Sequence, residues 1–407
     1  MSEQIKWIDN KMIKAYGKGV STELFSKQEI EKSRKFHQTF PDYQPTPLRA
    51  LNRLAESLEV GGIYVKDESY RFGLNAFKAL GGSYAIGRYL AKVLNKDISE
   101  LPFEVLTSPE IKEQLGDITF ATTTDGNHGR GIAWTANKLR QKAVVYMPKG
   151  SSPYRLQKIR EEGALAMITD LNYDDAVRMT AAKAEENGWV VVQDTSWEGY
   201  EEIPSWIMQG YGTMSAEALE EMNNLGIERP THIFIQAGVG ALAGSVQGYF
   251  ASLFQENRPK TVIVEANKAD CLYKSAQAAD GKPRIVDGDM ATIMAGLACG
   301  EPNLIGWNIL KDYSDMFISC PDWVAARGMR VLANPLLGDP RVISGESGAV
   351  TSGLLSSFLK DKSFQKAREL LDINEKSQIL IFNTEGNTDP YKYRSIVWDG
   401  EFPSAGK

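Results

Sequence analysis

The segment Thr119-Phe-Ala-Thr-Thr-Thr-Asp125-Gly-Asn-His-Gly-Arg-Gly-Ile-Ala133 joins a β-branched run, a small polar turn and the start of an apolar helix. This strand-to-helix pattern recurs along the chain, with roughly 10 to 20 residues of helical periodicity between most runs. Alternating strands and helices predict parallel sheets covered on both faces, so the expected fold class is α/β. The expected strands are Ile63–Val65, Ile118–Thr123, Ala143–Met147, Ala164–Thr169, Trp189–Gln193, His232–Gln236, Thr261–Glu265 and Gln378–Phe382.

The chain has 407 residues, and at about 150 residues per domain this length predicts two or three domains. No Gly/Ser linker, repeat or low-complexity tract divides it. We expect two open parallel-sheet α/β domains. The larger would comprise residues 1–83 and 204–407, and the smaller, residues 84–203, would be inserted in it.

The composition excludes several classes of protein. With 46 basic and 52 acidic residues the net charge is −6, so no basic field is available to bind nucleic acid. The first residues contain no apolar signal stretch, and no uncharged apolar run of about 18 residues occurs, so we expect a cytoplasmic protein without membrane contact. Cys271, Cys299 and Cys320 form no CxxC pair, which favours a reducing compartment but leaves their pairing open. Three histidines make no credible zinc site.

Four segments at strand-to-helix junctions can carry chemistry, because ligands of open parallel sheets bind there. The first runs from Lys66-Asp-Glu to Phe77-Lys78-Ala-Leu-Gly-Gly-Ser-Tyr84. A lysine at an apolar, glycine-flanked helix start is poorly solvated, which lowers its pKa and makes it a candidate amine nucleophile. The alternative is an ordinary solvated lysine.

The second segment is the turn and helix start of residues 119–133. Its free N–H groups can hold a carboxylate, with Thr123, Thr124, Gly126 and His128 as the candidate contacts. Asp125 stands where a general acid or base could face such a ligand, although an aspartate here can equally be a helix cap.

The third segment is Thr231-His-Ile-Phe-Ile-Gln-Ala-Gly238-Val-Gly240-Ala-Leu-Ala-Gly244. Its glycines let the backbone approach phosphate oxygens, but a structural turn is also possible. The string also fits a dinucleotide fingerprint, with Glu265 as the ribose ligand of an NAD(P)-dependent oxidoreductase. The fourth segment, Gln378-Ile-Leu-Ile-Phe-Asn-Thr384-Glu-Gly-Asn-Thr388, offers the Thr384 hydroxyl to a ring nitrogen, unless that hydroxyl only bonds its own turn.

These segments follow one another in a characteristic order: Thr46-Pro-Leu48, a Lys-Asp-Glu strand end, Phe77-Lys78, an Asn-His-Gly helix start, the glycine loop and a Thr-Glu-Gly-Asn turn. Over nearly the whole chain this order resembles the fold-type-II (tryptophan synthase β-like) pyridoxal-phosphate enzymes. The amino-acid sequences of three stretches are similar to those of the diaminopropionate ammonia-lyase family. They are Gly73-Leu-Asn-Ala-Phe-Lys78, Thr123-Thr-Asp125-Gly-Asn-His-Gly-Arg-Gly131 and Gln193-Asp194-Thr-Ser-Trp-Glu-Gly-Tyr200.

The resemblance implies pyridoxal 5'-phosphate in the cleft between the two domains of a homodimeric lyase. It implies that Lys78 forms the Schiff base, that Phe77 packs beside the cofactor and that Asn127 meets the 3-oxygen of the ring. Thr384 would meet the pyridine nitrogen. The phosphate would be held by Gly238, Val239, Gly240, Ala241 and Leu242.

The reaction so implied is α,β-elimination of the small amino acid 2,3-diaminopropionate to pyruvate and ammonia. A β-amine must leave with its proton, which favours acidic groups near the β-carbon. We expect Asp125 to act as base or acid at the α-carbon for at least one enantiomer. Asp194 would serve on the β-amine side or for the opposite enantiomer, unless it only caps its turn. Lys78 is the alternative α-base.

Other interpretations stay open. Serine/threonine dehydratases usually have a serine before Phe-Lys, where this chain has Asn75-Ala76. A dehydratase-type lyase or a β-replacing synthase with the same cofactor nevertheless remains the first alternative. The further alternatives are an NAD(P)-dependent oxidoreductase and a cofactor-bearing regulator without catalytic turnover. Among weaker segments, Ile343–Val350 resembles a helix start near the cofactor, and Met294–Pro302 is expected to line the mouth of the site, with Cys299 as packing.

Overall fold

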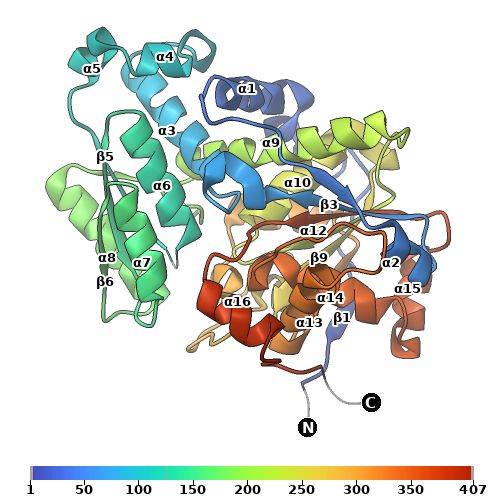
Figure 1. The fold of residues 1–407 in the computed structure, drawn as a ribbon. Coiled ribbons are helices and arrows are strands. Elements are labelled where there is room, and N and C mark those ends of the chain that lie inside the picture. Colours follow the sequence, from blue (N-terminus) through green and yellow to red (C-terminus); the bar gives the residue numbers. More distant parts are fainter. Residues whose placement is uncertain (1–2, 125, 405–407) are drawn as a thin grey trace.

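The computed structural model describes residues 3–124 and 126–404 and contains two β-sheets (Figure 1). The larger sheet has seven strands in the order β1-β10-β9-β8-β11-β3-β2, and the smaller has four in the order β6-β5-β4-β7. Strands of the larger sheet are β1 (Lys6–Asp9), β2 (Leu48–Ala50), β3 (Gly62–Asp67), β8 (His232–Gln236), β9 (Lys260–Ala266), β10 (Met316–Cys320) and β11 (Gln378–Asn383). Those of the smaller sheet are β4 (Thr119–Thr123), β5 (Lys142–Met147), β6 (Leu165–Ile168) and β7 (Val190–Val191).

Both sheets are largely parallel, which confirms the predicted α/β class. In the larger sheet β3, β11, β8, β9 and β10 run parallel, and the two edge strands β1 and β2 pair antiparallel with β10 and β3. All pairs of the smaller sheet are parallel. The eight expected strands are present, whereas β1, β2 and β10 were not predicted. The domain boundaries stay a prediction.

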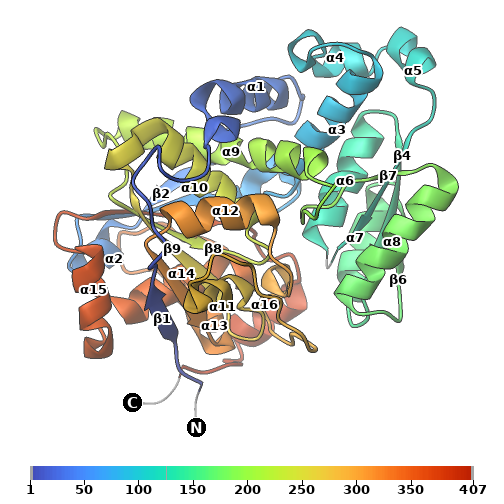
Figure 2. The same ribbon diagram turned by 180° about the vertical axis from the view of Figure 1, so that it is seen from behind.

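Helices separate the strands along the chain and cover the sheets (Figures 1 and 2). They are α1 (Lys27–Gln38), α2 (Asn52–Ser57), α3 (Ala79–Val93), α4 (Phe103–Leu106), α5 (Pro109–Leu115), α6 (Asn127–Lys138), α7 (Pro153–Glu161), α8 (Tyr173–Asn187), α9 (Glu202–Asn224), α10 (Ala241–Phe254), α11 (Cys271–Ala278), α12 (Leu304–Tyr313), α13 (Asp322–Ala333), α14 (Glu346–Phe358), α15 (Gln365–Leu371) and α16 (Pro390–Val397). Short 3₁₀ helices lie at Glu23–Phe25, Glu68–Gly73, Ile98–Glu100, Gln255–Asn257, Ala295–Leu297 and Lys362–Phe364. None of the described helices is long and apolar enough to cross a membrane.

The larger sheet is covered on both faces because its side chains alternate. Along β11, Ile379 and Ile381 pack into the core that includes α13 and α14, whereas Leu380 and Phe382 pack into the core that includes α9 and α10. The helix α3 contacts both α9 and α6, so it joins the cover of the larger sheet to that of the smaller.

Candidate active site

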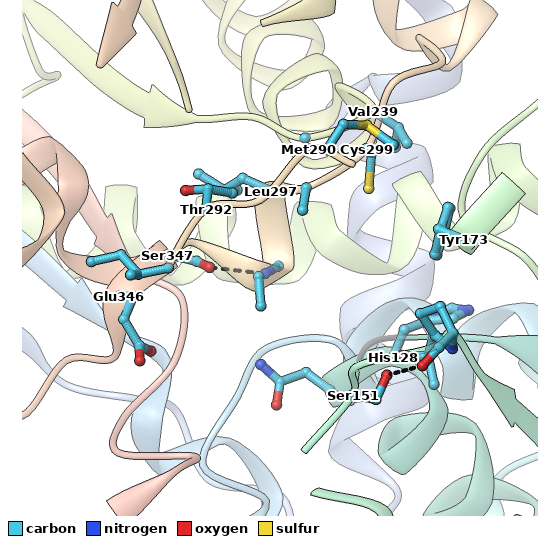
Figure 3. A pocket seen from close by; sticks show the side chains of 18 of the residues that line it. His128, Ser151, Tyr173, Val239, Met290, Thr292, Leu297, Cys299, Glu346 and Ser347 are labelled. Carbon is cyan, nitrogen blue, oxygen red and sulfur yellow. Dashed lines mark hydrogen bonds between the residues drawn. The ribbon is translucent and has the colours of Figure 1, made fainter. Parts of the chain in front are cut away.

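A cavity of about 890 Å³ lies between the two sheets, and residues from all four predicted segments line it. The lining includes Phe77, Lys78, Thr123, Thr124, Asn127, His128, Asp194, Gly238, Val239, Gly240, Ala241, Leu242 and Thr384. Residues 295–299, expected at the mouth of the site, line it as well. Figure 3 shows Glu346 and Ser347 on one side of this space, with His128 and Ser151 across from them. The strand-to-helix junctions thus meet at one place, as the sheet geometry predicts.

Lys78, immediately before α3, forms an ion pair with the Asp194 carboxylate. The Lys78 Nζ also lies 5.3 Å from the ring centre of Phe77 and 5.7 Å from that of Tyr211. Burial acts to lower the pKa of Lys78, but the Asp194 carboxylate, together with the Tyr211 and Cys299 side chains, raises the pKa above its ordinary value. The sequence analysis expected a lowered pKa for Lys78, and this expectation was wrong. The counter-ion Asp194 lies 116 positions away in the chain, so no local sequence pattern reveals it.

The Asp194 carboxylate is correspondingly stabilised as an anion. Burial alone would raise its pKa, but the Lys78 ammonium overrides burial and lowers it to about 2. Asp194 follows β7, and its backbone carbonyl accepts a hydrogen bond from Asn303 Nδ2 at 3.0 Å. At neutral pH the half-buried Lys78 ammonium and the buried Asp194 carboxylate are therefore both charged and in contact inside the cavity.

The Lys-Asp-Glu strand end has a structural role in this arrangement. The buried Lys66 ammonium pairs with Glu217 at 2.9 Å, and Arg71 pairs with Glu217 at 2.7 Å and with Glu68 at 2.8 Å. These ion pairs tie the end of β3, which leads to Lys78, to the long helix α9. Because buried charges are costly unless they are paired and hydrogen-bonded, the network holds a single arrangement of this segment.

The glycine loop Gly238–Leu242 leads from β8 into α10. Gly240 has φ +95°, a conformation that favours glycine, and the first turn of α10 offers N–H groups that have no partner within the helix. Glu265 does not serve a ligand here. Its buried carboxylate accepts the backbone N–H groups of Leu272 at 2.8 Å and Tyr273 at 2.6 Å, at the start of α11. The suggested ribose contact was therefore wrong.

Thr384 and Asn127 face the cavity from opposite sheets. The Thr384 Oγ1 accepts a hydrogen bond from Gln236 Nε2 at 2.9 Å, so its own hydrogen can be donated to another acceptor. Asn127 Nδ2 donates to Glu385 Oε2 at 2.5 Å. The Asn127 amide is thus bound to a protein carboxylate in this structure, and its contact with a cofactor oxygen stays a prediction.

The expected carboxylate contacts differ in what they can offer. The Thr123 hydroxyl bonds to Thr180 Oγ1 at 2.7 Å and Ala176 O at 3.1 Å, and its backbone is bonded to the Gln193 side chain. Its polar groups are engaged within the protein, so Thr123 is a poor candidate for a ligand contact. Thr124 Oγ1 accepts from the Gly126 N–H at 2.9 Å, which shapes the start of α6.

His128 Nε2 is bonded to Val192 O at 2.9 Å, which ties the start of α6 to the strand end that precedes Asp194. Asp125, the other predicted acid or base, lies outside the described residues. Its role rests on the sequence alone.

A carboxylate pair that the sequence analysis did not identify lies on the wall opposite His128. Glu385 accepts the backbone N–H of Ser347 at 3.1 Å, and Glu346 has Arg155 Nη2 4.0 Å from its Oε2. Burial and the Glu385 carboxylate raise the pKa of Glu346 to about 7, although Arg155 acts in the opposite direction. The sequence signal for this part of the site was the glycine-containing segment 343–350, which resembles a helix start near the cofactor.

Residues 39–370 match the family described as pyridoxal-phosphate dependent enzyme. A diaminopropionate ammonia-lyase of Salmonella typhimurium is 52% identical over 401 residues, which cover 98% of this chain and 99% of that protein. The chain belongs to the pyridoxal-phosphate-dependent enzymes, within the diaminopropionate ammonia-lyase family.

Solved structures of the Escherichia coli member of this family are similar throughout. Its complex with D-serine has a TM-score of 0.92 at 49% identity and covers 99% of both chains. Its complex with an aminoacrylate-PLP azomethine reaction intermediate has a TM-score of 0.90 at 49% identity and covers 98% of both chains. That relative therefore binds small amino-acid ligands, and pyridoxal phosphate is the cofactor of this family.

The donor set of the cavity fits that cofactor. An aldehyde needs an amine, a phosphate needs N–H donors, and a neutral ring nitrogen needs a hydroxyl donor. Lys78 supplies the amine and the start of α10 supplies the N–H groups, while Thr384 supplies a hydroxyl already oriented by Gln236. The three groups line one cavity, so the residues present suit the cofactor.

Proposed function

We propose that the protein catalyses the α,β-elimination of 2,3-diaminopropionate to pyruvate and ammonia. The observation that carries this proposal is the Lys78–Asp194 ion pair inside a cavity whose other walls suit pyridoxal phosphate. A diamino acid brings a second ammonium into that cavity, and an ionised carboxylate is the group that attracts it. The identity to diaminopropionate ammonia-lyases over nearly the full chain supports the same substrate.

Several residues of this chain would hold the cofactor. Lys78 would bind its aldehyde carbon and Phe77 would pack beside it, while the loop Gly238–Leu242 would hold its phosphate. Thr384 would donate to the ring nitrogen and Asn127 to the 3-oxygen. When bound, pyridoxal phosphate accepts the electron pair left at the α-carbon after the substrate loses its α-proton.

While it is paired with Lys78, the Asp194 carboxyl is ionised at neutral pH, because its pKa is lowered to about 2. With Lys78 joined to the cofactor, Asp194 would lose this counter-ion and its pKa would rise. The carboxylate could then attract the β-ammonium of the substrate and exchange a proton with it. On the basis of the sequence, Asp125 would move the α-proton of at least one enantiomer, with Lys78 as the alternative base. The start of α6, at Thr124, Gly126 and His128, would hold the substrate carboxylate through helix N–H groups.

Pyruvate release from a panel of amino acids tests the proposal. Purified protein saturated with pyridoxal phosphate is assayed with both enantiomers of 2,3-diaminopropionate, with serine and with threonine. We expect kcat/KM for one diaminopropionate enantiomer to exceed that for either hydroxy amino acid by about tenfold or more, because only a β-ammonium can pair with the buried carboxylate. A higher value for serine or threonine would instead identify a dehydratase.

The resemblance also leads us to propose that the enzyme is a cytoplasmic homodimer. The low cysteine content and the ordinary composition of the chain agree with a reducing compartment. Light scattering of the purified holoenzyme tests the oligomeric state, and a monomeric mass with full activity would contradict it.

A further inference from the structure

Asn303 is a fully buried residue that lies outside the cavity, at the N-terminal end of α12. Its backbone carbonyl accepts from the Trp307 N–H at 2.8 Å within α12, and three further hydrogen bonds tie it to its surroundings. Its backbone N–H donates to Val239 O at 2.7 Å, its Oδ1 accepts from the Gly306 N–H at 2.8 Å, and its Nδ2 donates to Asp194 O at 3.0 Å. One residue thus contacts the glycine loop through its backbone, and the helix start and the segment that carries Asp194 through its side chain.

The first turn of α12 is held against both of these segments. The Leu304 N–H donates to Ser196 Oγ at 2.8 Å, two residues beyond Asp194. On the other side, a Cβ on Gly306 would lie 2.6 Å from Gly240 O, which shows how closely this turn approaches the loop. The start of α12 therefore connects the end of β7 in the smaller sheet with the loop after β8 in the larger.

Helix capping alone does not explain an asparagine at this position. A cap needs only a side-chain oxygen, which serine, threonine or aspartate also provide. The amide hydrogen is the additional feature, and it is used on the Asp194 carbonyl. Because that carbonyl belongs to a residue with 5% exposure, losing its donor would leave a buried acceptor unpaired and displace it.

We infer that Asn303 is a positioning residue that holds Asp194 opposite Lys78 and in register with the loop 238–242. The inference rests on the proposed function, since it assumes that the Asp194 carboxylate takes part in the reaction. Asn303 itself does not line the cavity. It acts by keeping the backbone of Asp194 in place while the carboxylate works.

Two substitutions separate positioning from capping. Asn303→Asp and Asn303→Ser both keep an oxygen that can cap α12 and the backbone bond to Val239. The aspartate has no side-chain hydrogen to donate to Asp194 O, and the shorter serine lacks the second branch that carries the amide donor. We expect kcat per bound cofactor to fall about tenfold or more for 2,3-diaminopropionate, with KM and the dissociation constant for pyridoxal phosphate changed less than about threefold. Ser108→Ala removes the cap of α5, away from the cavity, and is the control that costs stability without changing kcat.

A double-mutant cycle with Asp194→Asn shows whether the effect passes through Asp194. Asn303→Ser should lower kcat in the wild-type background and add less than about twofold in the Asp194→Asn background. A crystal structure of Asn303→Ser should also show the Asp194 carboxylate displaced from Lys78 Nζ. Unchanged kcat in both Asn303 variants, or fully additive losses, would overturn the inference while leaving the proposed function intact. An Asp194→Asn enzyme with normal kcat would instead refute the role of Asp194, and the inference with it.

Discussion

Lys78 and Asp194 form an ion pair inside the cavity, although Lys78 follows β3 of the larger sheet and Asp194 follows β7 of the smaller. Each residue stabilises the charged form of the other. The carboxylate raises the pKa of the Lys78 ammonium, and the ammonium lowers the pKa of Asp194 to about 2. The nucleophilic amine is therefore kept protonated until a ligand changes this pairing.

Asp194→Asn should move the pH dependence of cofactor uptake. Without its counter-ion, the half-buried Lys78 ammonium is left with the unfavourable effect of desolvation, so its pKa falls. Only the neutral amine attacks an aldehyde, and the rate of pyridoxal-phosphate uptake by cofactor-free protein should reach half-maximum at least about two pH units lower than in the wild type. Stopped-flow absorbance measures this rate, with Asp175→Asn, which lies away from the cavity lining, as control. An unshifted profile would show that the pair does not control Lys78.

Glu346→Gln should change how stability depends on pH. The pKa of Glu346 is raised from 4.5 to about 7, so between these values the folded protein binds more protons than the unfolded chain, and stability falls as pH rises through this window. The neutral glutamine avoids this loss. We expect the free energy of unfolding of the variant to exceed that of the wild type by about 1–3 kcal/mol at pH 8 and to be about equal to it at pH 4. Urea titrations of cofactor-free protein test this, with the exposed Glu186→Gln as control, and equal stability at both pH values would contradict it.

Gly306→Ala should weaken cofactor binding. The new Cβ would lie 2.6 Å from Gly240 O and 2.9 Å from Gly240 C, so the proposed phosphate loop must shift. Alanine otherwise favours a helix over glycine by about 1 kcal/mol, so a loss cannot come from helix propensity. We expect the dissociation constant for pyridoxal phosphate to rise about tenfold or more, measured by fluorescence. Gly116→Ala, where φ is +62° and nothing lies within 4 Å, should cost stability but leave this constant unchanged. Unaltered cofactor binding in Gly306→Ala would argue against the proposed role of the loop 238–242 in holding the phosphate.

Asp125→Asn tests the acid–base assignment that comes from the sequence alone. Removing a general acid or base lowers turnover by about 100-fold or more, so kcat should fall to this extent for at least one enantiomer of 2,3-diaminopropionate. Pyruvate release is followed separately for the two enantiomers. Near-normal rates with both would remove Asp125 from the mechanism.

The sequence predicted the central strands because buried parallel strands are nearly continuous apolar runs between turn signals. β11 and β8 are examples, and both are fully paired in the structure. The edge strands β1 and β2 were missed because they are short and include charged residues. β10 was missed for another reason: its run Met316-Phe-Ile-Ser-Cys320 is apolar without alternation, and such a run also fits a buried helix.

The sequence predicted which strand-to-helix junctions form the site, but not which side chains pair with one another there. Junction residues were found because each segment has its own strand, turn and helix signal. Pairing joins positions that no local pattern connects: Asn127 meets Glu385 across 258 positions and Asn303 meets Asp194 across 109. For this reason the direction of the Lys78 pKa shift was wrong, and Glu385, Gln236 and Asn303 were missed.

The account depends on a covalent bond between Lys78 and the cofactor. Borohydride reduction of the holoenzyme, followed by proteolysis and mass spectrometry of the peptides, locates that bond directly. We predict a phosphopyridoxyl group on the peptide that contains Lys78, and its loss in Lys78→Ala. A modification on a different lysine, or a reduced protein that carries no such group, would contradict the account.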